Sequence, residues 1–114
     1  MRTFDDSADV VRKMLQLRAD QDMLFGVPLG RGYSWDIILV LFIADAEGRE
    51  LTGRQAIIRA GVAFEVGKRW LSYIANAGIV LGDGELDPDV VVTLAPYAVS
   101  RIEEYVGHIQ ISRH

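Results

Sequence analysis

The chain contains no cysteine, no long apolar segment and fewer basic than acidic residues. Without cysteine it can form neither disulfides nor thiolate metal sites, and a cysteine nucleophile is excluded. The longest apolar run, Ile37 to Ala44, has 8 residues, whereas a membrane-spanning helix needs about 20. The first residues also lack the apolar segment of a signal peptide. We therefore expect a soluble cytoplasmic protein with no membrane partner.

The length of 114 residues fits one domain, residues 1–114, with one hydrophobic core. Half of the residues are hydrophobic and a quarter are charged, as in ordinary globular proteins. Twelve basic and 16 acidic residues give a net charge of −4. This charge argues against a protein that coats nucleic acid by bulk attraction, but it leaves room for a locally basic face.

Glycines divide the chain at helix-length intervals, because glycine readily adopts the left-handed conformation that follows a helix end. Cutting at Gly26, Gly48, Gly61 and Gly78 predicts a mainly α fold of the α+β class. An N-terminal helix lies within 1–26, a core unit spans 34–94 and a C-terminal helix lies within 95–114. The predicted helices are 7–25, 35–47, 53–60, 63–77 and 96–111, and the predicted strands are 79–81 and 90–94.

Local signals support several of these helices. Asp6 or Ser7 can cap the first helix and Ser34 the second, while Thr52 and Gln55 fit a capping box for the third. The second helix is apolar all round, so we expect it at the centre of the core. The helix 63–77 has no good capping residue, and its buried stripe is predicted to be Val66, Leu71, Trp70 and Ile74.

The middle of the chain has the order of a winged helix-turn-helix. A short helix, a turn containing Gly61 and a longer helix are followed by two strands around an Asp83-Gly84 turn. In such a fold the second helix enters the DNA major groove, and the hairpin, or wing, lies beside it. The order therefore predicts a protein that binds double-stranded DNA.

The stretch from Ser34 to Tyr105 resembles winged-helix regulators of the MarR type, in particular their short proteobacterial members. The resemblance is carried by an ordered set of short matches: Trp35-Asp36, Ala46-Glu47-Gly48-Arg49, Leu51-Thr52, Gly61-Val62, Arg69-Trp70-Leu71, Gly78-Ile79-Val80, Asp87-Pro88, Leu94 and Pro96. It implies a homodimer formed through the terminal helices and bound to palindromic DNA, and it implies a role in transcription regulation.

Two features depart from that family. Its wings usually carry arginines after the Asp-Pro turn, whereas this chain has Asp89 followed by three valines. Residues 79–94 contain four acidic and no basic groups, a net charge of −4, whereas residues 50–78 contain four basic and two acidic groups, a net charge of +2. Phosphate repels an acidic wing. The second departure is Ala63-Phe64-Glu65, where the family often has small polar residues.

The basic residues that cluster in the helix-turn-helix lead to a set of candidate DNA contacts: Thr52, Arg54, Gln55, Arg59, Phe64, Glu65, Lys68 and Arg69. The basic members could instead form an ordinary solvated helix face. Phe64 fits contact with a thymine methyl, a protein interface or the edge of the core. Glu65 fits either an acceptor for cytosine or a partner for the helix dipole.

The last helix carries a narrow apolar stripe at spacings of three and four residues, made of Val99, Ile102, Val106 and Ile109. A stripe too narrow for core packing alone marks an interface, so these four residues are the predicted dimer contacts.

Nothing in the sequence indicates catalysis, a cofactor or a metal. The alternating carboxylates Asp83, Glu85, Asp87 and Asp89 lack the glycine and the glutamate of a calcium loop. His108 and His114 lack neighbours at metal-site spacing. We therefore expect no enzyme, no cofactor and no metal. The alternative to DNA binding is a protein-interaction module, in which the acidic wing and Phe64 engage a basic protein partner.

Overall fold

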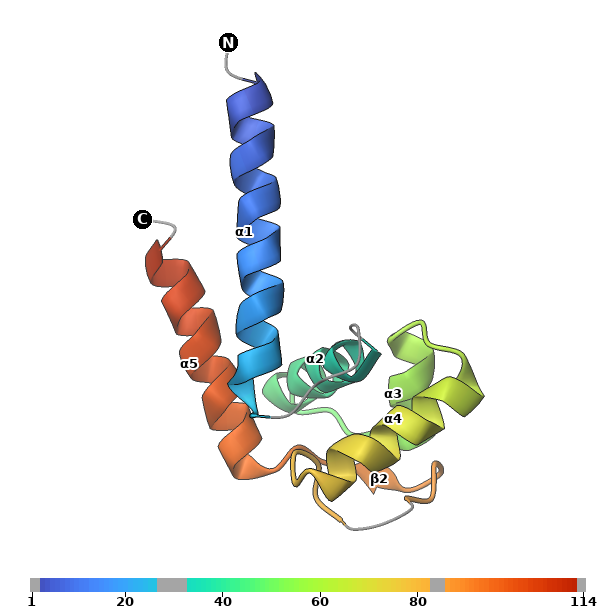
Figure 1. Ribbon diagram of the computed structural model, residues 1–114. Helices are drawn as coiled ribbons and strands as arrows, with labels where there is room; N and C mark the ends of the chain where they lie inside the picture. Colours follow the sequence, from blue (N-terminus) through green and yellow to red (C-terminus); the bar gives the residue numbers. More distant parts are fainter. Residues whose placement is uncertain (1–2, 27–32, 83–85, 113–114) are drawn as a thin grey trace.

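The computed structural model describes residues 3–26, 33–82 and 86–112, and its described part is mainly helical with one two-stranded antiparallel sheet (Figure 1). The elements in chain order are α1 (Thr3–Leu24), α2 (Tyr33–Ala46), β1 (Leu51–Thr52), α3 (Gly53–Arg59), α4 (Phe64–Asn76), β2 (Val91–Val92) and α5 (Pro96–Ser112). Each predicted helix is therefore present, with its ends shifted by at most four residues.

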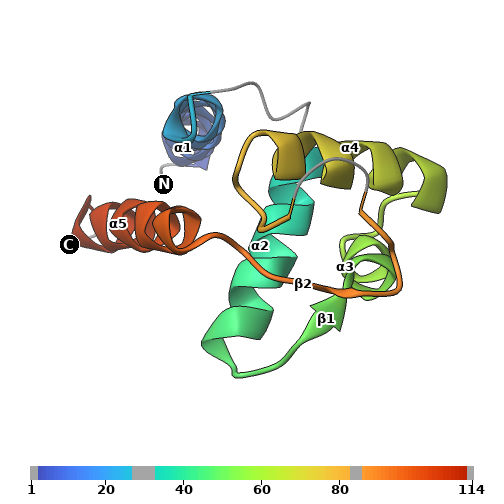
Figure 2. The same cartoon turned by 90° about the horizontal axis from the view of Figure 1, so that it is seen from below.

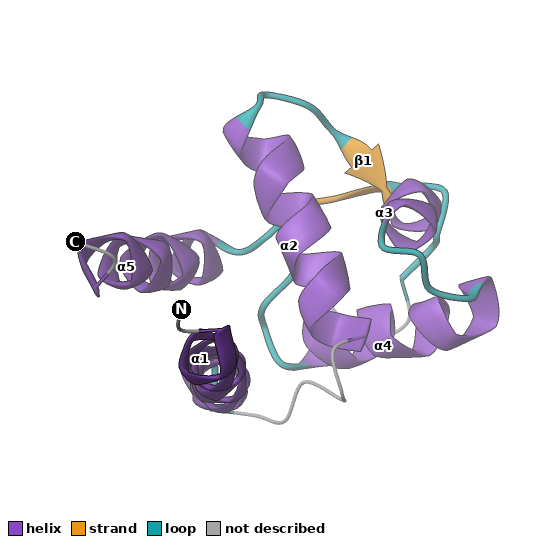
Figure 3. Ribbon diagram, turned by 90° about the horizontal axis from the view of Figure 1, so that it is seen from above, coloured by secondary structure: helices purple, strands orange, loops and turns teal. Residues whose placement is uncertain are grey.

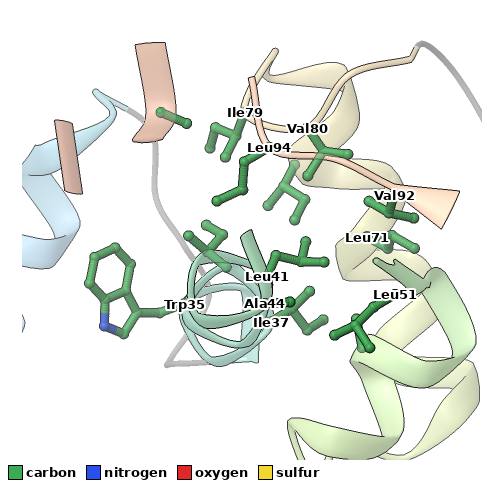
Figure 4. Packing of buried hydrophobic residues seen from close by; sticks show 14 of the residues in the cluster. Trp35, Ile37, Leu41, Ala44, Leu51, Leu71, Ile79, Val80, Val92 and Leu94 are labelled. Atoms are coloured by element: carbon green, nitrogen blue, oxygen red, sulfur yellow. The ribbon is translucent and has the colours of Figure 1, made fainter. Parts of the chain in front are cut away.

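α2 lies at the centre of the hydrophobic core, as its apolar sequence predicts (Figure 4). Ile37 and Ile38 are fully buried, and Leu41 and Ala44 continue the same buried side of the helix. Around them the core takes residues from both strands and from α3, α4 and α5, including Leu51, Ile57, Leu71, Val92 and Ile102. The opposite side is less enclosed, since Ile43 is half exposed.

The sheet joins segments that are distant in the sequence. β1 pairs antiparallel with β2, with Leu51 opposite Val92 and Thr52 opposite Val91. The predicted hairpin also forms in part, because Val80 pairs with Leu94 and the Leu81 N–H donates to the Thr93 carbonyl at 2.9 Å. The Asp83-Gly84 turn lies outside the described residues. Figure 2 shows the chain through β2 running from beside α3 to the start of α5.

α1 and α5 lie on one side of the molecule and the helices α2, α3 and α4 on the other (Figure 3). The two terminal helices meet near the end of α1, where Arg101 donates to the Leu24 carbonyl and the Tyr105 hydroxyl donates to the Leu17 carbonyl. Away from this contact they diverge, and α1 projects beyond the rest of the chain (Figure 1). The described molecule is consequently elongated, with extents of 52 × 26 × 25 Å.

Two predicted helix caps are wrong. α1 begins at Thr3 and runs through Asp6 and Ser7, so both residues lie within the helix and neither precedes it. α2 begins at Tyr33, so that Ser34 lies within the helix, where it is fully buried. The Ser34 hydroxyl has no hydrogen-bond partner among the described residues. Because the helix already includes Tyr33, Ser34 lies past the cap position and does not act as a cap.

The buried stripe of α4 also differs from the prediction. Gly67, Leu71, Ile74 and Ala75 are buried, whereas Val66 and Trp70 are only partly covered. The physical reason is a close approach of α3, because a Cβ on Gly67 would lie 2.4 Å from Cγ2 of Ile57. The glycine lets the two helices pack at this point, so Gly67 rather than Val66 belongs to the buried side of α4.

Candidate nucleic-acid interface

α3 and α4 form a helical pair joined by a four-residue turn, Ala60 to Ala63. The capping box at the start of α3 is confirmed, with the Gln55 N–H donating to Thr52 Oγ1 at 3.1 Å and the Thr52 N–H donating to Gln55 Oε1 at 2.9 Å. Gly61 has a φ of 73°, which lets the chain reverse. Val62 is buried beneath the turn. α4 starts without a side-chain cap, as predicted.

The outward side of α4 faces the loop 86–90 across a groove of about 610 Å³. α4 contributes polar side chains to this groove, and the loop contributes Leu86 and Pro88. The α4 residues that line it are Glu65, Lys68, Arg69, Ser72 and Asn76. Ser72 and Asn76 were not among the predicted contacts, although their spacing along the outward side of the helix would have indicated them.

The loop 86–90 is bound to the start of α3 through its backbone. The Arg54 N–H donates to the Pro88 carbonyl at 2.8 Å, and the Gly53 N–H donates to the Val90 carbonyl at 3.2 Å. A Cβ on Gly53 would lie 3.3 Å from Cα of Pro88 and 2.7 Å from Cδ2 of Leu71. Together with the capping box, these bonds use the exposed N–H groups of the first turn of α3. Few backbone N–H groups of that turn therefore remain free to bind a phosphate.

Four side chains form a cluster between α3, α4 and the loop, which we call the Arg54 cluster: Arg54, Phe64, Lys68 and Asp89. Arg54 donates from Nε to Asp89 Oδ1 at 2.9 Å and from Nη2 to Asp89 Oδ2 at 3.4 Å. Its guanidinium carbon lies 4.4 Å from the centre of the Phe64 ring, and Lys68 Nζ lies 5.2 Å from the same centre. Both distances fit cation–π contacts.

Electrostatics in the cluster follow from its hydrogen bonds. The bond from Arg54, aided by its charge, lowers the pKa of Asp89 below the ordinary value, although partial desolvation works in the opposite direction. The bond to Asp89 and the charge of that carboxylate raise the pKa of Arg54. Both groups therefore carry full charge at neutral pH. Lys68 is also paired, with Glu65 Oε1 at 3.4 Å.

The predicted DNA contacts thus divide into two groups. Arg54, Lys68 and Glu65 form ion pairs within the chain, Thr52 and Gln55 cap α3, and Phe64 supports two cations. Arg59, at the end of α3, and Arg69, in the groove, are exposed and have no ion pair in the part of the chain that the structure describes. Among the described side chains of α3 and α4, these two arginines are therefore the basic groups that a ligand could bind without breaking an ion pair.

The predicted interface stripe on α5 needs a correction. Ile102 is fully buried within a single chain and belongs to the core, so it cannot serve as an exposed interface residue in this fold. Val99 packs against the same core, and Val106 is 38% exposed. The Ile109 side chain lies outside what the structure describes. On α1, Val11 and Leu15 are more than half exposed one helical turn apart, and neither was among the predicted interface residues.

The described residues contain no group of three or more histidine or acidic side chains arranged to hold a metal ion. None of the helices in ranges 3–26, 33–82 and 86–112 is both long enough and apolar enough to cross a membrane. Comparison with protein families, with curated proteins and with solved structures finds no match to this chain.

Proposed function

We propose that this protein is a winged helix-turn-helix transcription regulator that binds double-stranded DNA as a homodimer, as its resemblance to the MarR type implies. In this proposal α3 and α4 are the helix-turn-helix, α4 enters the major groove, and the loop 86–90 with the sheet is the wing. The observation that carries it is the polar outward side of α4, which lines an open groove and presents Arg69 without an internal partner.

The chemistry of this surface suits a duplex. Arginine reads guanine through two parallel hydrogen bonds and also binds phosphate, while serine and asparagine side chains can contact base edges or backbone. Arg59 lies at the end of α3, where it can contact the flanking backbone. Such contacts are local, so they are compatible with a net charge of −4 over the whole chain.

The alternative, a protein-interaction module that uses Phe64 and the acidic wing, has less support. Phe64 is partly buried and lies against Arg54 and Lys68, so it is not presented as an apolar anchor. Asp89 is paired with Arg54, which removes one charge from the acidic surface. Both contacts reduce what this surface offers to a basic partner.

Homodimer formation through the terminal helices belongs to the same proposal. With Ile102 assigned to the core, the exposed apolar side chains described on the terminal helices include Val106 on α5 and Val11 and Leu15 on α1. These three side chains are exposed within one copy, and α1 projects beyond the rest of the chain (Figure 1). An uncovered apolar surface on a terminal helix favours association.

Replacing Arg69 with glutamine tests the DNA-binding surface. We expect the Kd for duplex DNA to rise about tenfold, because one well-placed arginine contributes about 1–3 kcal/mol to recognition. The matched control is Arg12→Gln, which removes the same charge on α1, where Arg12 pairs with Asp9 at 2.7 Å. Fluorescence anisotropy with a labelled duplex measures both. Equal Kd values for the two variants would show that α4 does not face the DNA.

A further inference from the structure

Arg54 binds Asp89 in the manner in which arginine binds a phosphate. Two neighbouring nitrogens, Nε and Nη2, each donate to a different carboxylate oxygen, at 2.9 and 3.4 Å. A phosphodiester also offers two oxygens to one edge of a guanidinium group. The carboxylate of Asp89 therefore occupies the edge of Arg54 that a DNA phosphate would use.

The cations of the Arg54 cluster are held in position for an anion. The ring of Phe64 contacts the guanidinium of Arg54 and the ammonium of Lys68, so one rigid side chain orients two cations from different helices. Their side chains remain accessible, with exposed fractions of 45% for Arg54 and 42% for Lys68. Each cation has one carboxylate partner, Asp89 for Arg54 and Glu65 for Lys68, and because these ion pairs are exposed and weak, both cations can exchange that partner for a phosphodiester.

Asp89, whose carboxylate occupies this site, lies on a loop whose position does not depend on the ion pair. Backbone hydrogen bonds fix the loop to α3, and the Asp89 N–H donates to Asp87 Oδ1 at 2.9 Å. Loss of the Asp89 charge should therefore leave the loop in place. Since both partners are exposed, the ion pair is weak enough for a stronger ligand to displace it.

We propose that Arg54 and Lys68, oriented by Phe64, bind a phosphate of the DNA backbone, and that Asp89 occupies this site in the free protein. Binding then exchanges a carboxylate of the protein for a phosphate of the DNA. The inference rests on the proposed DNA-binding function. The exchange gives the acidic wing a role. Asp89 lowers DNA affinity by competing with the phosphate for Arg54, and not only by repelling the duplex.

The test compares Asp89→Asn with Asp87→Asn. Both variants remove one negative charge from the same loop, and asparagine at position 87 keeps the Oδ1 that accepts from the Asp89 N–H. We expect Asp89→Asn to lower the Kd for duplex DNA about two- to fivefold more than Asp87→Asn does, the range expected for releasing one exposed ion pair. Circular dichroism confirms that both variants remain folded.

A second comparison isolates Arg54. Arg54→Gln is measured in the wild-type and in the Asp89→Asn backgrounds, and we expect the larger rise in Kd in the Asp89→Asn background, because there Arg54 gives up only its phosphate contact. Equal effects in the two backgrounds, or equal Kd values for the two loop variants, would overturn the exchange even where the wild-type protein binds DNA well.

The outcomes also separate this inference from the proposed function. If Arg69→Gln weakens DNA binding while Asp89→Asn and Arg54→Gln leave it unchanged, the result supports the proposed function and contradicts the exchange. Binding by Asp89→Asn where the wild-type protein binds poorly supports both. Failure of every variant to bind duplex DNA at low salt overturns both.

Discussion

Glutamate in place of Ile102 is expected to remove a large part of the free energy of unfolding. The Ile102 side chain has no exposed surface and packs in the core against residues from the other helices. Losing its burial and placing a carboxylate there should cost at least about 4 kcal/mol. A typical domain is stable by about 5–15 kcal/mol, so this loss amounts to between about a quarter and most of its stability. Urea unfolding followed by circular dichroism measures the loss.

Val106→Glu is the matched control on the same helix. Val106 is 38% exposed, so the substitution should change the stability of one chain by about 1 kcal/mol or less. Under the dimer proposal it should instead lower the mass in sedimentation from two chains to one, above all when combined with Leu15→Glu. Stability of Ile102→Glu equal to that of Val106→Glu would contradict the packing of α5. A mass unaffected by Val106→Glu and Leu15→Glu would contradict pairing through this surface.

Alanine at position 67 is the second substitution with a large expected effect. The new methyl group would lie 2.4 and 2.8 Å from two carbons of Ile57, a β-branched side chain held close to its own backbone. Alanine favours a helix over glycine by about 1 kcal/mol, but the forced separation of α3 and α4 should outweigh this gain and destabilise the protein by about 1–3 kcal/mol overall. DNA affinity should fall as well, since the same contact sets the angle of α4.

Gly107→Ala provides the comparison, because a Cβ at this helical position meets no atom within 4 Å. Here only the helix preference acts, and we expect stabilisation by about 0.5–1 kcal/mol. Thermal unfolding of the two variants should therefore shift in opposite directions. Stabilisation by both would mean that α3 and α4 do not approach as closely as the structure has it.

Local signals predicted the parts of this fold that depend on neighbouring residues. The capping box of Thr52 and Gln55, the glycine turn at Gly61 and the apolar α2 each depend on a few consecutive residues, and each is confirmed. β1 was not predicted, because two residues are too few to show a strand period. It exists because its partner, about forty residues further along, covers it.

Features that depend on contacts between distant residues could not be predicted in the same way. The ion pair of Arg54 and Asp89 joins residues 35 positions apart, so the sequence showed a basic helix and an acidic wing but not their mutual neutralisation. Ile102 fits an exposed stripe and a buried stripe equally well by spacing, and only the arrangement of α5 against the core decides between them. Gly67 gave no signal, because a helix contact that excludes a methyl group leaves no trace in local periodicity.

The salt dependence of duplex DNA binding by the wild-type protein tests the central proposal most directly. Binding of a labelled mixed-sequence duplex is measured from low to physiological salt. We expect binding in the micromolar range at about 50 mM salt. Log Kd should rise linearly with log salt concentration with a slope of at least about 3.6, because Arg59 and Arg69 of the two chains together neutralise about four phosphates. Absence of binding at low salt, or binding that salt does not weaken, would contradict a DNA-binding role for α4.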